Sequence, residues 1–138
     1  MRHTAGRTTL PGWVISRDDI EVFGPYIKAS EGRRFLELNG VSAGAIAQSF
    51  PTVPGRRYRL TFDLAGHPGP ARVTAAGQSI DFEFDGVGRT GQNPGWVSKA
   101  WEFTAAQART TLEFSSGNAG WWNGPFLDNV AVVPAGKP

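Results

Sequence analysis

The sequence predicts an all-β protein, an antiparallel β-sandwich of eight or nine short strands. Three observations support this prediction. Apolar and polar residues alternate through most of the apolar runs, which is the period of a half-buried strand. The 138 residues include 18 Gly and 10 Pro, which stand between those runs and are poor in helix interiors. Turn signals recur about every 8–20 residues, a spacing typical of sandwiches and barrels.

The segment 57–64 (RYRLTFDL) shows the alternation most clearly. We expect one face of this strand to lie in the core, with Tyr58, Leu60, Phe62 and Leu64. We expect Arg57 and Arg59, on the other face, to be exposed to solvent. The other apolar runs from which the strands are expected to form lie, in chain order, at 13–15, 20–23, 35–39, 45–50, 71–75, 79–84, 97–103, 110–114 and 126–133.

The connections between the expected strands carry their own signals. Gly77 separates two short runs and predicts a hairpin. The segment 85–95 (DGVGRTGQNPG) is expected to be a long loop because four Gly and a Pro interrupt it. The segment 104–109 resembles a helix in composition, but six residues that join two strands are expected to form a turn.

Composition and charge exclude several classes of function. Apolar residues make up 40% of the chain and aromatic residues 12%, too many for a disordered protein. No apolar run approaches the ~18 residues of a membrane-spanning helix, so no membrane interaction is expected. The absence of cysteine removes disulfides, thiolate nucleophiles and zinc–thiolate sites.

The charge balance also argues against a nucleic-acid partner. The 14 basic and 12 acidic side chains leave a net charge of +2. The arginines at 33–34, 56–57 and 59 fit a solvated strand face better than a concentrated phosphate-binding patch.

A single domain is expected over residues 11–133, with short tails at 1–10 and 134–138. This length is near the usual domain size and buries about two thirds of the unfolded surface. The first residues, MRHT, lack the apolar stretch of a secretory signal, so no signal peptide is expected in this chain.

An ordered series of motifs runs through the chain: PGW at 11–13, IEV at 20–22, FLELNG at 35–40, AIAQSFPTVPGRRYRLTFDLAGHPG at 45–69, WEFTA at 101–105 and GPFLDNVAVV at 124–133. The series resembles the bacterial choice-of-anchor C domain and the related plant cell-wall family called domain of unknown function 642. The resemblance covers residues 11–133. It implies a jelly-roll, galactose-binding-like sandwich that is extracellular or at the cell surface, binds polysaccharide, and is not an enzyme.

Two features of the resembled family are missing. The stretch MRHTAGRTTL at 1–10 stands where the family usually has a first strand with Asn-Gly-x-Phe-Glu, and this chain is expected to be the bare domain without the family's sorting anchor after Pro138. The resemblance also implies a structural calcium ion, because related modules place a ligand at the position of Asp128. Carboxylate oxygen suits calcium, and a hydrogen bond from Asp128 to a neighbouring turn is the alternative.

The sequence gives little evidence for a group of catalytic residues. His3 and His67 have no Ser or Asp at the spacing of a triad. The carboxylates of Asp81, Glu83 and Asp85 share one strand face at intervals of about 6.5–7 Å, which is compatible with a glycosidase pair. The same alternation predicts an ordinary solvated face, so no catalytic residue is assigned.

Aromatic residues in loops mark the candidate ligand site. Trp121 and Trp122 are adjacent in GNAGWWNGP (117–125), where no alternation would bury both rings. Two such rings lower solubility unless they bind a ligand or plug the end of a sheet. Trp13 and Trp101, in contrast, are expected in the core, and Trp96, which follows the glycine-rich segment, is expected to be half-exposed at the start of a strand. The candidate set adds polar and aromatic side chains from neighbouring loops: Asn118, Asn123, Trp96, Tyr26, Arg89, Gln92 and Asn93.

The sequence therefore predicts a non-catalytic carbohydrate-binding module that recognises cell-wall or surface polysaccharide. One alternative is a structural or adhesive surface domain that binds a protein through the same aromatic loop. A weaker alternative is a sandwich-fold enzyme that cleaves polysaccharide with Asp81, Glu83 and Asp85. The sequence leaves open which sugar is bound and whether the site is a concave sheet face or the loop end.

Overall fold

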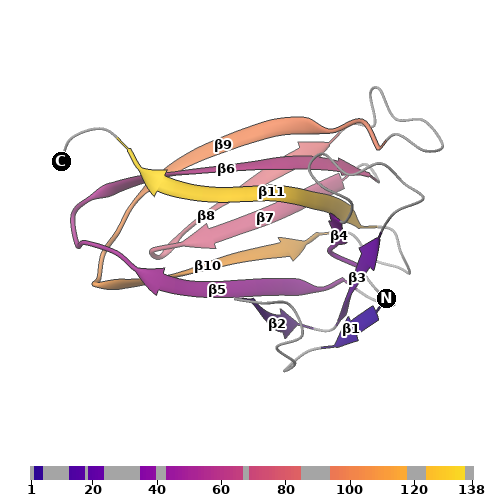
Figure 1. The fold of residues 1–138 in the computed structure, drawn as a ribbon, viewed down its shortest axis with the longest axis horizontal. Helices are drawn as coiled ribbons and strands as arrows, with labels where there is room; N and C mark the ends of the chain where they lie inside the picture. Colours follow the sequence, from indigo (N-terminus) through magenta and orange to yellow (C-terminus); the bar gives the residue numbers. More distant parts are fainter. Residues whose placement is uncertain are drawn as a thin grey trace.

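Alternating apolar and polar residues build two stacked antiparallel sheets in the computed structural model (Figure 1). The structure describes residues 2–4, 13–17, 19–23, 35–39, 43–66, 69–84, 94–117 and 124–135. Eleven strands are present in this part of the chain, and their neighbours in each sheet run antiparallel. The predicted sandwich is confirmed.

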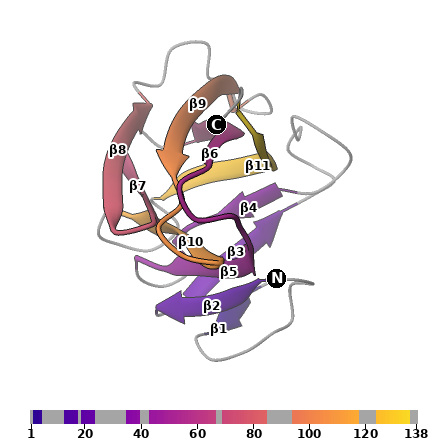
Figure 2. The ribbon, with the colours of Figure 1, turned by 90° about the vertical axis from the view of Figure 1, so that its left-hand side faces the viewer.

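The larger sheet has six strands in the order β1-β3-β4-β11-β6-β9. Their bounds are β1 Arg2–Thr4, β3 Asp19–Phe23, β4 Phe35–Glu37, β11 Pro125–Pro134, β6 Arg57–Gly66 and β9 Val97–Thr104. The smaller sheet has five strands in the order β2-β5-β10-β7-β8. Their bounds are β2 Val14–Arg17, β5 Ala45–Pro51, β10 Arg109–Ser116, β7 Gly69–Ala75 and β8 Gln78–Phe84. Figure 2 shows the sandwich from one end.

The main core lies between the sheets and follows the predicted alternation of β6. The predicted inner residues Tyr58, Leu60, Phe62 and Leu64 are all buried, while Arg57 and Arg59 are exposed. Phe62 packs edge-on against Phe114 of β10, with ring centroids 5.2 Å apart. Trp13 and Trp101 are only partly buried and pack against this core from its margin.

The connections agree with the sequence in most places. The β7–β8 hairpin turns at Ala76 and Gly77, which both have positive φ. The segment 105–108 contains no helix. Residues 2–4, which the sequence analysis assigns to a tail, form β1 and pair with β3. Within the described ranges, no helix is long and apolar enough to cross a membrane.

Candidate functional site

Several strand ends gather at one end of the sandwich, which we call the loop end and which lies on the right in Figure 1. The antiparallel register defines it, through the pairs Phe23↔Phe35, Gly66↔Pro125, Leu64↔Val97, Gly69↔Phe84 and Ala71↔Ser116. The segments 24–34, 67–68, 85–93 and 118–123 each connect two of these strand ends. They are outside the described residues, but their anchors are described.

A small apolar cluster lies at the loop end, separate from the main core. Phe35, Ala65 and Phe126 are buried together, and Trp96 packs against them. Their neighbours Leu36, Leu64 and Leu127 belong to the main core. Because successive strand residues point to opposite faces, these aromatic residues lie on the outer face of the larger sheet. We call Phe35, Ala65, Trp96 and Phe126 the outer cluster.

The rings of the outer cluster are in direct contact. Trp96 meets Phe35 edge-on, with centroids 5.4 Å apart at 80°. Phe35 packs on Phe126 at 4.8 Å. Trp96 was predicted to be half-exposed at the start of a strand, and it is partly buried immediately before β9. One predicted ligand residue is therefore held in place by a small aromatic core.

Gly66 lets the end of β6 fit under this cluster. Its φ is +88°, and a Cβ there would meet the ring of Phe126 at 2.6–2.9 Å, so another residue would displace the ring. The Gly66 N–H donates to the carbonyl of Pro94 at 3.3 Å. This bond ties the start of the 94–96 segment to the larger sheet.

Two buried polar residues, Glu37 and Asn39, accompany the outer cluster. Glu37 is 1% exposed and Asn39 is 0% exposed. Glu37 accepts a hydrogen bond at 3.1 Å from the N–H of Gly124, immediately after the segment that contains Trp121 and Trp122. Sequence reasoning missed Glu37, Phe35 and Phe126 as site residues, although FLELNG and GPFLDN are among the motifs of the resemblance.

Most predicted ligand residues lie outside the described part of the chain: Trp121, Trp122, Asn118, Asn123, Tyr26, Arg89, Gln92 and Asn93. Three of the connecting segments contain all of them. Tyr26 precedes the anchor Phe35, the 85–93 residues precede Pro94 and Trp96, and the 118–123 residues precede Gly124 and Phe126. The structure thus brings together anchors of all three segments at the outer cluster.

The outer face of the smaller sheet lacks a comparable aromatic surface in the described strands. The aromatic residues of these strands are Phe50, Phe82, Phe84 and Phe114, and all four pack toward the main core. Small and polar side chains such as Ser49, Thr111 and Arg72 occupy the other face. The geometry favours the loop end over this sheet face as a ring-stacking site.

Asp128, the predicted calcium ligand, lies at a bulge in β11 on the outer face of the larger sheet. It stands opposite Asp63, and the register shifts after it where Asn129 adopts a φ of 54°. Asp128 Oδ1 accepts the N–H of Asn129 at 2.9 Å. Asp63 accepts the Ser98 hydroxyl at 2.9 Å and the Asn129 amide at 3.4 Å.

These contacts do not fit a calcium cage. Calcium takes six to eight oxygen ligands, whereas the amide nitrogen of Asn129 and the hydroxyl of Ser98 are turned as donors toward Asp63. No group of three or more His, Cys, Asp or Glu that could hold a metal ion occurs among the described residues. The hydrogen bond of Asp128 matches the alternative that the sequence left open.

Asp81 and Glu83 are exposed on the outer face of β8, as the solvated-face interpretation predicted, and Asp85 and His67 lie outside the described residues. Arg72 binds Asp81 through two nitrogens, at 2.8 and 3.3 Å. The hydrogen bond from Arg72 lowers the pKa of Asp81 below its ordinary value. A glycosidase general acid needs a raised pKa, so Asp81 is in the wrong environment for that role.

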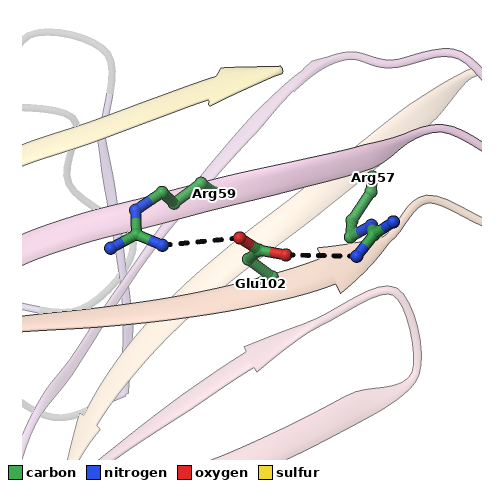
Figure 3. Close-up of polar contacts among 3 residues, drawn as sticks. All are labelled: Arg57, Arg59 and Glu102. Carbon is green, nitrogen blue, oxygen red and sulfur yellow. Dashed lines mark hydrogen bonds and ion pairs between the residues drawn. The ribbon is translucent and has the colours of Figure 1, made fainter. Parts of the chain in front are cut away.

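The basic residues of β6 form a surface ion-pair network. Arg57 and Arg59 both point to Glu102 of β9, with N–O distances of 3.5 and 3.4 Å (Figure 3). The shared carboxylate reduces the positive field of the two guanidinium groups. The solvated-face interpretation of Arg57 and Arg59 agrees with this arrangement, while Arg33 and Arg34 are outside the described residues.

Comparison with known protein families gives a match over nearly the whole chain. Residues 1–133 match the model of the family described as "Protein of unknown function (DUF642)". The chain is 33% identical over 145 residues to Protein DUF642 L-galactono-1,4-lactone-responsive gene 1 of Arabidopsis thaliana. It is 29% identical over 141 residues to halomucin of Haloquadratum walsbyi. These alignments cover 93% and 97% of this chain but only 38% and 2% of the two relatives.

Solved structures share the fold at low sequence identity. A CBM35 from Paenibacillus barcinonensis matches with a TM-score of 0.60 at 15% identity, covering 98% of this chain and 99% of that one. A CBM61 module solved in complex with β-1,4-galactotriose matches with a TM-score of 0.56 at 18% identity, covering 91% and 90%. A CBM4 structure gives a TM-score of 0.59 at 11% identity, covering 98% and 95%. The chain is therefore similar in fold to the jelly-roll sandwiches of carbohydrate-binding modules.

Proposed function

The chain belongs to the DUF642 family, and from that premise we propose that it is a non-catalytic carbohydrate-binding module. Its ligand is a neutral polysaccharide of a cell wall or cell surface, and its place is outside the cytoplasm. The fold likeness to carbohydrate-binding modules supports the class of function. The arrangement of the loop end supports the site.

The observation that carries this proposal is the convergence of three segment anchors on the outer cluster. Trp96 and Phe35 are in contact, and Phe126 packs on the other side of Phe35. The segments next to these anchors contain aromatic, amide and guanidinium side chains: Tyr26, Arg89, Gln92, Asn93, Asn118, Trp121, Trp122 and Asn123. A ligand at this end would meet residues that are far apart in the chain.

These residue types suit the chemistry of a pyranose ring. One face of such a ring exposes C–H groups, and its rim carries hydroxyls. A Trp ring offers a large flat apolar surface with little conformational entropy to lose, and amide or guanidinium groups satisfy the hydroxyls. Because a shallow site buries little surface and displaces ordered water, we expect dissociation constants on the order of 10–1,000 μM.

A catalytic function is less well supported. Of the three carboxylates that the sequence groups, Asp81 is paired with Arg72, and the hydrogen bond from Arg72 lowers its pKa. Asp81 and Glu83 are both exposed to solvent on β8, whereas a glycosidase general acid needs a desolvated environment. This environment supports a binding module over a glycosidase that uses these two residues.

The test is titration of wild-type protein and the variants Trp121→Ala and Trp122→Ala with neutral plant and bacterial polysaccharides. We expect at least one variant to lose most of its affinity while its melting temperature stays near that of the wild type. Trp101→Phe is the matched control, because Trp101 lies on β9 opposite Leu60, away from the loop end. We expect this control to bind normally.

Two results would contradict the proposal. One is wild-type protein that binds no polysaccharide in the panel. The other is a pair of folded tryptophan variants that both bind as tightly as the wild type. If one variant unfolds, that ring supports the fold, and the affinity of the other variant decides the question. Capture of a protein partner by a chain that binds no glycan would favour the adhesive alternative.

A further inference from the structure

A buried carboxylate stands beside the proposed ligand site. Glu37 occupies the outer face of β4, two residues after Phe35 and directly opposite Phe126 of β11. Its exposed fraction is 1%, although alternation in FLELN would place it on the side of the sheet away from the main core. A carboxyl group buried in this way is tolerated only when hydrogen bonds compensate for the lost water.

The carboxylate binds the backbone at the base of the tryptophan segment. Gly124 donates its N–H to Glu37 Oε2 at 3.1 Å in a buried environment. The next residue, Pro125, accepts the N–H of Leu38 at 3.0 Å. Glu37 at the end of β4 and Leu38 immediately after it therefore bind the two consecutive residues Gly124 and Pro125, where β11 begins.

Gly124 is placed so closely that only glycine fits. A Cβ at this position would overlap the side chain of Asn39 and lie 2.7 Å from its backbone nitrogen. The other end of the segment is also tied, since Gly117 donates its N–H to Pro70 at 3.0 Å. The six residues 118–123 thus run between two fixed glycines.

We propose that Glu37 is a positioning residue for polysaccharide binding, which holds the Trp121–Trp122 segment in register through Gly124 without touching the ligand. This inference rests on the proposed function. Its physical basis is preorganisation: a segment with fixed ends loses less conformational entropy when a ligand orders it.

The experiment compares three substitutions at Glu37 by two measurements. Glu37→Met keeps the length of the side chain and removes the acceptor. Glu37→Asp keeps the carboxyl group but shortens the side chain by one methylene, and it serves if the Met variant does not fold. Glu37→Gln keeps an acceptor oxygen and tests whether that oxygen is enough to hold the Gly124 N–H. The measurements are the affinity for the wild-type polysaccharide ligand and the hydrogen exchange of the Gly124 amide by NMR.

We expect Glu37→Met and Glu37→Asp to expose the Gly124 amide to exchange and to weaken binding by about tenfold, as expected when a buried donor loses its partner. Glu37→Gln should stay within about threefold of the wild type. Val73→Ala, in the main core on β7, is the control for general loss of stability. It should lower the melting temperature while leaving affinity and Gly124 exchange unchanged at a temperature where it is folded.

Three results separate the possible failures. If the Gly124 amide stays protected in Glu37→Met, the hydrogen bond does not hold the segment, and the inference is wrong. If the amide becomes exposed but affinity is unchanged, Glu37 serves the fold alone, and the inference is again wrong. If the wild type binds no polysaccharide, the proposed function fails and positioning for that ligand fails with it, while Gly124 exchange still reports whether Glu37 holds the segment.

Discussion

Phe62 lies where the two sheets meet, 1% exposed, and its ring packs edge-on against Phe82 at 5.1 Å and Phe114 at 5.2 Å. These contacts join β6 of the larger sheet to β8 and β10 of the smaller one. We expect Phe62→Ala to lower the free energy of unfolding by ~3–5 kcal/mol, because it removes apolar contacts and leaves a cavity. Urea denaturation measures the loss. Thr61→Ala, one residue away on the outer face, should change the same free energy by less than about 0.5 kcal/mol.

Asp128 is a second residue whose role can be isolated. Its carboxylate accepts the N–H of Asn129 within the β11 bulge, and the described residues around it do not form a calcium site. We expect the melting temperature to be the same in chelator and in added calcium, since a ligand bound only to the folded state would raise it. A drop in chelator that disappears in Asp128→Ala would show instead that this carboxylate holds a metal ion.

At the scale of the element, the connection between β5 and β6 is fastened at the end of the sandwich opposite the loop end. Val53 donates its N–H to the hydroxyl of Tyr58 at 2.9 Å. Thr52 and Gly55 donate theirs to Ala108 and Ala105 at 2.9 and 2.8 Å. The connection at this end is therefore held by hydrogen bonds, whereas the loop end combines backbone hydrogen bonds with the aromatic packing of the outer cluster.

Removing the Tyr58 hydroxyl tests whether this end of the sandwich supports the fold without contributing to ligand binding. Tyr58→Phe keeps the ring stacked on Phe103 and removes the oxygen that Val53 uses. We expect a loss of ~0.5–1.5 kcal/mol in the free energy of unfolding, the usual value for one hydrogen bond. Polysaccharide affinity should not change, as measured by the same titrations. A large loss of affinity in this folded variant would place the ligand at the wrong end for the proposed site.

For the whole molecule, the electrostatic balance predicts how ligand binding depends on salt. The net charge is only +2, and the exposed Arg57 and Arg59 share the carboxylate of Glu102. Stacking on a neutral sugar involves little charge. We expect affinity to change by less than about twofold between about 50 and 500 mM NaCl, whereas six or more phosphate contacts would lose ~10³ or more over a smaller range. A steep salt dependence in titrations would point to an anionic ligand.

The fold class could be predicted from the sequence because alternation is a local property of each strand. Tyr58, Leu60, Phe62 and Leu64 lie inside because two apolar faces must cover each other. The Gly77 turn and the absence of a helix at 105–108 were predictable for the same reason. The residues that favour a turn and the length of a connection between strands are both local properties of the sequence. The half-buried position of Trp96 also followed from its place after a glycine-rich segment.

The candidate site was only partly predictable. The sequence identified the aromatic and amide residues of the connecting segments, but it did not indicate that Phe35, Trp96 and Phe126 would meet. It also gave no reason to bury Glu37, because alternation assigns that side chain to an outer face. Whether an outer face is covered depends on what other parts of the chain lie against it.

What the sequence alone determined is therefore the β-sandwich, the facing of its strands and the types of residue available to a ligand. What the tertiary structure decided is the register of β4, β6 and β11, which brings Glu37, Gly66 and Phe126 together at one end. The physical reason is the range of the interactions. Periodicity and turn propensity act between near neighbours. In contrast, Phe35 and Phe126 are 91 positions apart and Glu37 and Gly124 are 87 positions apart, so only the packing of the whole chain can bring them into contact.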